Sequence, residues 1–112
     1  MPIFITQGRF TQDAVKGMIA RPEDRAEAVT ELLAKTGGKL LAYYFTFGKS
    51  DFLVISEGPN EGVAVAAIVS AATGGVTDMH TNLAMTSAEM KNAFARAGEV
   101  AASFRPAGHQ QA

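Results

Sequence analysis

The chain has 112 residues, 47% of them hydrophobic, so it is long enough to close one hydrophobic core and too short for two domains. Its 10 basic and 11 acidic residues are mixed along the sequence, which predicts no broad basic surface for nucleic acid. The lack of cysteine excludes disulfides, thiolate metal sites and cysteine nucleophiles. Without a leader pattern or a long apolar window, we expect a cytoplasmic protein with no membrane partner.

The first third of the chain predicts one strand followed by helical sequence. Residues 3–7 are β-branched and aromatic and end at Gly8, which is typical of a buried strand followed by a turn. Thr11 can cap a short helical segment, which Pro22 interrupts because proline disfavours the helical conformation in the residue before it. Pro22 then suits the first position of a second helix, which stops at Gly37-Gly38.

The middle of the chain predicts a β-hairpin. Two β-prone runs, 40–47 and 52–56, flank a turn of Gly48-Lys49-Ser50-Asp51. If Gly48 faces Asp51, Phe47 pairs with Phe52, and strand alternation places an aromatic row on one face. That row consists of Tyr43, Phe45, Phe47 and Phe52. The opposite face carries Ala42, Tyr44, Thr46, Leu53, Ile55 and Glu57. Since both faces are largely apolar, we expect something to cover each of them.

The last part of the chain predicts a helix, a strand and a final helix. Residues 61–73 are alanine-rich and stop at Gly74-Gly75, and residues 76–85 return as a strand. Thr86 and Glu89 have the spacing of a capping box before an apolar stripe that runs from Met90 to Phe104. We therefore expect a single domain over residues 1–104 and a flexible tail over 105–112.

The element order β-α-β-β-α-β with an added C-terminal helix predicts an α+β, ferredoxin-like fold with a four-stranded antiparallel sheet. In such a fold the helices cover only one face of the sheet. The second apolar face then needs a partner, most simply the same face of another copy. The sequence therefore predicts a homodimer or a higher homo-oligomer.

Residues 48–55 (GKSDFLVI), followed by 57–60 (EGPN), resemble the GYD-domain family, named for a Gly-x-Tyr-Asp turn between strands. The resemblance runs over nearly the whole chain and includes the glycine pairs 37–38 and 74–75. Gly48 and Asp51 match the motif, whereas Ser50 stands where the family usually has Tyr, so no role of that tyrosine carries over. The resemblance implies a dimeric α/β barrel, in which two ferredoxin-like subunits pack sheet to sheet.

His80 is the first candidate for chemistry, because it lies within a predicted strand and alternation places Asp78 and Asn82 on the same face. An imidazole between a carboxylate and an amide can act as a general base, a proton shuttle or a ligand-orienting donor. The alternative is an ordinary hydrogen-bonded strand histidine. His109 lies in the polar tail and is expected to take no part. Asp78 and His80 supply only two ligands, so we expect no metal.

The aromatic row is the second candidate, as the wall of a pocket for a planar or apolar small molecule, to which Asn82 would add a polar contact. The alternative is that these rings form core or dimer interface. Gly48 and Asp51 are expected to act in the turn, through positive φ and side-chain bonds to nearby amides. The glycine pairs follow helices and match no phosphate-loop pattern, so no organic cofactor is predicted.

Three functions remain open from the sequence. The leading hypothesis is a homo-oligomer that binds a small apolar or aromatic molecule in a pocket beside the inter-subunit sheet, with His80, Asn82 and the aromatic row as contacts. The second is a cofactor-independent enzyme, resembling the monooxygenases or isomerases with this barrel, in which His80 is the acid/base and Asp78 its partner. The third is a structural or regulatory assembly module, which predicts no pocket.

Overall fold

A computed structural model describes residues 1–108, so His109 and the rest of the predicted tail lie outside the described residues. The elements are β1 (Ile3–Phe10), α1 (Gln12–Ala20), α2 (Ala26–Lys35), β2 (Lys39–Phe45), β3 (Phe52–Glu57), α3 (Asn60–Ala72), β4 (Val76–Ala84) and α4 (Ser87–Ala101). No helix within the described residues is long and apolar enough to cross a membrane.

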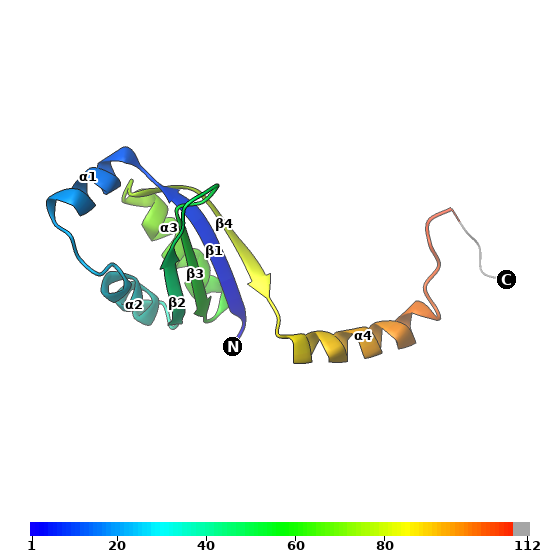
Figure 1. Cartoon of the computed structure of the whole chain (residues 1–112). Helices are drawn as coiled ribbons and strands as arrows, with labels where there is room; N and C mark the ends of the chain where they lie inside the picture. Colours follow the sequence, from blue (N-terminus) through cyan, green and yellow to red (C-terminus); the bar gives the residue numbers. More distant parts are fainter. Residues whose placement is uncertain (109–112) are drawn as a thin grey trace.

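The four strands form one antiparallel sheet in the order β2-β3-β1-β4. The strands on either side of each crossover helix are separated by another strand, which is the split βαβ arrangement. Residues of α1, α2 and α3 line a cavity together with one face of the sheet, here called the helix face. The opposite face, here called the open face, is covered by no helix within residues 1–108 (Figure 1). The fold is therefore ferredoxin-like, as the sequence predicts, with α4 as the additional helix.

The sequence predicts that strand β1 ends at Gly8, but the strand continues to Phe10. A β-carbon on Gly8 would lie 2.8 Å from the ring of Phe52 and 2.9 Å from the side chain of Met79, so the glycine gives these two side chains room. Opposite Gly8 the register of β1 and β4 shifts, and Asp78 there adopts a φ of 51°. The glycine thus marks a close approach beside a β-bulge rather than a turn.

The hairpin forms as predicted, but its turn is wider and its register differs by two residues. Phe45, not Phe47, pairs with Phe52. The Thr46 amide donates to the Asp51 carbonyl over 2.8 Å, and the Thr46 hydroxyl donates to the Ser50 carbonyl over 2.6 Å. These bonds hold the residues from Thr46 to Asp51 as one turn. Because the shift is even, Tyr43, Phe45 and Phe52 still share a face.

Helix α2 begins at Ala26, four residues after the predicted start at Pro22. The Asp24 carboxylate accepts a bond from the Ala26 amide over 2.9 Å, which satisfies a free donor of the first turn. The capping box of α4 is confirmed, since Thr86 and Glu89 each accept a bond from the backbone amide of the other. Helix α4 ends at Ala101, three residues before the predicted Phe104, and the other helix and strand boundaries agree with the predictions to within a residue or two.

The hydrophobic core of the single chain is small: Leu33, Phe52 and Ala66 are its buried apolar side chains. Helix α4 buries none of its residues and projects from the end of β4 (Figure 1). The molecule accordingly measures 68 × 28 × 23 Å, with a radius of gyration of 18.9 Å. A compact chain of this length would have a radius of gyration of about 13 Å. The elongation comes from α4 and the segment after it.

Candidate functional site

The main concave feature is a cavity of about 540 Å³ between the helix face and helices α1, α2 and α3. Its floor consists of alternate residues of the four strands, and its walls are small and aliphatic side chains of the helices. The floor includes Thr6, Phe10, Tyr43, Phe52, Val54, Ser56, Val76 and Met79. The cavity exists because the wall residues are small, among them Ala14, Gly17, Ala28, Ala66 and Ala67.

The aromatic row lies on the helix face and includes Phe10, a residue that the sequence did not indicate. The ring of Phe10 is 5.0 Å from that of Phe52 and 5.1 Å from that of Phe45, centre to centre, and Phe45 lies 5.5 Å from Tyr43. These tilted contacts lie in the favourable range for aromatic pairs. Tyr43 and Phe52 line the cavity, and the ring of Phe45 contacts those of Tyr43 and Phe10. Phe47 lies in the turn and is fully exposed.

Three hydroxyl groups give the cavity floor its polar character: that of Thr6, which bonds to the Thr81 hydroxyl over 2.9 Å, and those of Ser56 and Tyr43. Ser56 is only 3% exposed and lines the cavity. The phenol of Tyr43 is half-buried on a strand that neighbours β3. Burial raises the pKa of Tyr43 above its ordinary value of 10.0, while Arg25 acts to lower it and Asp24 to raise it. The Ser56 and Tyr43 hydroxyls are therefore neutral at physiological pH and can donate or accept a hydrogen bond.

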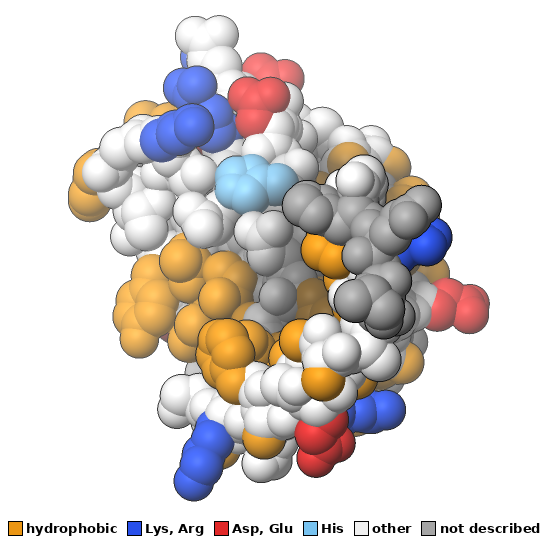
Figure 2. All heavy atoms as spheres, turned by 90° about the vertical axis from the view of Figure 1, so that its right-hand side faces the viewer, with side chains coloured by type: hydrophobic (Ala, Val, Ile, Leu, Met, Phe, Trp, Pro, Cys, Tyr) orange, Lys and Arg blue, Asp and Glu red, His pale blue; other side chains and the backbone are white. Residues whose placement is uncertain are grey.

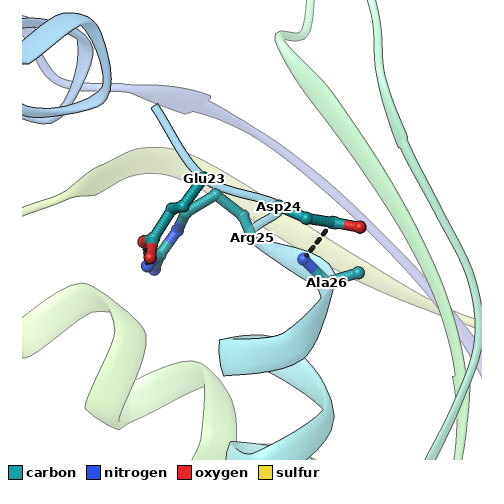
Figure 3. A network of polar contacts seen from close by, with 4 residues as sticks. All are labelled: Glu23, Asp24, Arg25 and Ala26. Carbon is teal, nitrogen blue, oxygen red and sulfur yellow. Dashed lines mark hydrogen bonds and ion pairs between the residues drawn. The ribbon is translucent and has the colours of Figure 1, made fainter. Parts of the chain in front are cut away.

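The segment between α1 and α2 supplies the charged residues of the cavity. Arg21, Glu23 and Arg25 line it, and the Arg25 guanidinium donates to the Glu23 carboxylate over 2.7 Å. Figure 3 shows these two side chains lying together, with Asp24 directed to the other side toward the amide of Ala26. One cation and one anion of the segment therefore neutralise each other.

His80 and Asn82 lie on the open face, away from this cavity, because they alternate with Met79 and Thr81. His80 borders a separate hollow of about 290 Å³ with Gln7 and the turn residues 46–50. Of the predicted ligand-binding row, only Phe47 reaches this hollow. The structure thus brings Tyr43 and Phe52 together in one site and separates them from His80, Asp78 and Asn82. Asp78, at the bulge, is exposed.

The two residues that match the family's turn motif support the sheet. The Asp51 carboxylate accepts a bond from the Phe10 amide over 2.9 Å, and the Asp51 amide donates to the Gly8 carbonyl over 2.8 Å. Gly48 has a φ of 154°. Asp51 therefore ties the hairpin turn to the end of β1, where the ladder to β4 is irregular. Within residues 1–108, no group of three or more acidic or histidine side chains is placed to hold a metal ion.

Some lining residues could have been found from the sequence, and others could not. Ser56 shares its strand parity with Phe52, so alternation along β3 places it on the same face. Arg21, Glu23 and Arg25 carry no such signal, because their place at the cavity depends on how the connection between α1 and α2 crosses the edge of the helix layer.

The strand order, the three helices on one face and the cavity between them define a ferredoxin-like α+β protein with an internal pocket. Residues 4–94 match the family model of the GYD domain. The chain therefore belongs to the GYD-domain family, as the turn motif indicates. The matched region contains nearly the entire sheet and extends into α4 as far as Phe94.

The chain is also similar to solved structures. FFRP-DM1 is 13% identical to this chain with a TM-score of 0.44, and the match covers 76% of this chain and 100% of FFRP-DM1. TTHA0845 from Thermus thermophilus has 17% identity and a TM-score of 0.41, covering 78% and 96%. An antibiotic biosynthesis monooxygenase has 17% identity and a TM-score of 0.44, covering 77% and 98%. No curated protein matches the chain in sequence.

Proposed function

We propose that this GYD-domain protein binds a small apolar or aromatic molecule in the cavity beneath its helices, and that it does so as a homo-oligomer. The observation that carries the binding proposal is the 540 Å³ cavity itself. Its volume falls within the range of about 300–1,000 Å³ that is typical of small-molecule sites. The pocket differs from the one that the sequence suggests, because it lies inside one subunit rather than beside an inter-subunit sheet.

The chemistry of the cavity favours a planar or compact apolar ligand with one polar group on its surface. Phe10, Phe52 and Val54 offer apolar contact on the floor, with Leu33 and Val29 above. Ser56 and Tyr43 offer the hydroxyls that would orient the ligand. Each of these hydroxyls can donate or accept a hydrogen bond with a polar atom of the ligand.

The binding proposal is tested with N-phenyl-1-naphthylamine, a neutral apolar probe whose fluorescence rises in a dry pocket. Ala67 lines the cavity from α3, so Ala67→Phe fills it, whereas Ala64 lies on the same helix but does not line it. We expect Ala67→Phe to weaken probe binding at least tenfold and Ala64→Phe to leave it unchanged. If circular dichroism shows that Ala67→Phe unfolds the protein, the smaller substitution Ala28→Leu on α2 replaces it in the binding test. Equal binding by all variants would place the site elsewhere.

Association between copies is supported by apolar surface that a single chain leaves exposed. The open face includes Ile3, Ile5 and Ile55, and Tyr44 on this face is 61% exposed. On α4, Phe94 is 70% exposed, and Phe104 just beyond the helix is 69% exposed. Figure 2 views the molecule from the end where α4 projects, and it shows a cluster of hydrophobic side chains on that surface.

The exposed area fits a second copy of the chain. At about 200 Å² for a fully exposed aromatic side chain, Tyr44, Phe94 and Phe104 together present roughly 400 Å². A standard interface buries about 800 Å² per partner, so these three rings would supply half of it. Because each chain carries both the open face and α4, a two-fold pair covers both on each chain with one contact type.

Light scattering coupled to size exclusion tests the association. We expect the wild-type chain to elute as a dimer or larger species, and Phe94→Ser to weaken association about 30-fold, as for an aromatic residue at the centre of an interface. Glu99→Ser, on the opposite side of α4, is the matched control and should leave the assembly intact. A wild-type monomer at all concentrations would contradict the proposal.

A cofactor-independent enzyme is the second candidate, because His80 borders a hollow on the open face beside the family's turn. In this proposal His80 is the acid/base and Asp78 its partner. His80→Ala should then abolish turnover of a phenolic substrate and leave both assembly and probe binding unchanged. Turnover that survives the substitution would contradict the enzyme proposal and leave the proposal of binding in the cavity unaffected.

A further inference from the structure

The charge on the cavity rim bears on the class of ligand. The lining residues that carry a charge are Arg21, Glu23 and Arg25, two cations and one anion. Glu23 and Arg25 pair with each other over 2.7 Å. Within residues 1–108, Arg21 forms no ion pair. Arg21 is therefore the one charged lining residue within residues 1–108 that stands outside an ion pair, and Asp24, which acts on Tyr43, does not line the cavity.

Local sequence places Arg21 at this rim. Pro22 disfavours a helical conformation in the residue before it, so α1 ends at Ala20 and Arg21 caps the helix with φ of −137°. The Arg21 amide still donates to the Gly17 carbonyl over 2.9 Å, which holds the residue against the last turn of α1. Its backbone is thus anchored between a helix end and a proline, and the residue is exposed while it lines the cavity.

From these contacts we infer that the ligand is an amphiphilic acid, with an apolar or aromatic body inside the cavity and a carboxylate or similar anionic group at Arg21. The inference rests on the binding proposed above and adds the charge of the ligand. A planar guanidinium suits this role because its fork of donors matches the two oxygens of a carboxylate. The alternative role of Arg21 is to offset the dipole at the C-terminus of α1.

Two probes with one skeleton separate these roles. 8-Anilinonaphthalene-1-sulfonate carries an anionic group that N-phenyl-1-naphthylamine lacks, and both fluoresce in apolar pockets. We expect the anionic probe to bind the wild-type chain about two- to fivefold more tightly than the neutral one, the range of an exposed ion pair. Arg21→Gln should remove this difference, which is read as the ratio of the two probe affinities within each variant. Arg96→Gln, on α4 and with the same change in net charge, should preserve it.

Each outcome decides one proposal. Loss of the discrimination in Arg21→Gln alone supports an acidic ligand, and a purely structural arginine would change the stability of α1 without changing the ratio of the two affinities. Equal binding of both probes to the wild type, blocked by Ala67→Phe, would overturn the acidic ligand and keep the cavity as the site. If neither probe binds, the cavity proposal fails together with this inference.

Discussion

Helices α3 and α4 have similar lengths and many alanines, but they relate to the sheet in opposite ways. Helix α3 has no side-chain cap at its N-terminus, yet it buries Gly62 and Ala66 within the domain. Helix α4 has a complete capping box and a clear apolar stripe, yet it buries none of its residues. A cap and an amphipathic stripe therefore stabilise a helix locally without deciding what it packs against.

Close backbone approach explains the difference. A β-carbon on Gly62 would lie 2.0 Å from the Thr36 carbonyl oxygen, so α3 meets the end of α2 at a distance that only glycine permits. On α4, Gly98 has no atom near the equivalent position. Helix α3 is thus held by close contact with the end of α2, whereas nothing within residues 1–108 packs closely against α4 at Gly98.

The largest expected effect comes from breaking the contact of α3. Gly62→Ala should lower the free energy of unfolding by about 3 kcal/mol, because the added methyl group meets backbone that cannot move aside cheaply. Urea denaturation measures this change. Gly98→Ala is the matched control and should instead stabilise α4 by about 0.5–1 kcal/mol, since alanine favours the helix. Equal effects of the two substitutions would contradict the contrast between the helices.

A smaller effect is expected from removing the cap of α4. Thr86→Ala deletes the hydroxyl that accepts from the Glu89 amide over 3.1 Å. It should weaken α4 by about 1 kcal/mol. Amide hydrogen exchange, read residue by residue, should show faster exchange in α4 and unchanged protection in the sheet. Loss of protection throughout the sheet would mean that α4 supports the body of its own chain.

The smallest effect is expected from pH. Bonds from the backbone and side chain of Thr86 hold the pKa of Glu89 below its ordinary value of 4.5. The carboxylate therefore stabilises the first turn of α4 above pH 4.5, and this stabilisation is lost as the pH falls through the lowered pKa. Hydrogen exchange of the Thr86 amide should accelerate over that range beyond its intrinsic pH dependence. Glu89→Gln, which keeps an acceptor but does not titrate, should remove this additional change.

Most of the fold could be predicted because its signals are local. Alternation assigned Tyr43, Phe45 and Phe52 to one face even though the pairing with Phe47 was wrong, since a shift of two residues preserves the face. Thr86 and Glu89 predicted the start of α4, because both capping partners lie within one turn. The prediction that β1 ends at Gly8 was wrong. The glycine makes room for Phe52 and Met79, and only its neighbours in β3 and β4 reveal this.

The candidate site was less predictable. The sequence suggested one pocket for the aromatic row together with Asn82 and His80, but these groups occupy opposite faces of the sheet. Alternation gives faces within a strand, and only the pairing of β1 with β3 and β4 shows which faces of different strands coincide. The rim residue Arg21 had no sequence signal, because its place depends on the packing of α1 and α2.

The sequence by itself determined the strands, the helices, the membership in the GYD-domain family and the two apolar faces of the sheet, because propensity, caps and alternation act over a few residues. Tertiary structure alone decided the register of the hairpin, the separation of His80 from the aromatic row, the cavity and the projection of α4. Each of these depends on contacts between residues far apart in the chain, such as Asp51 with Phe10 and Gly62 with Thr36.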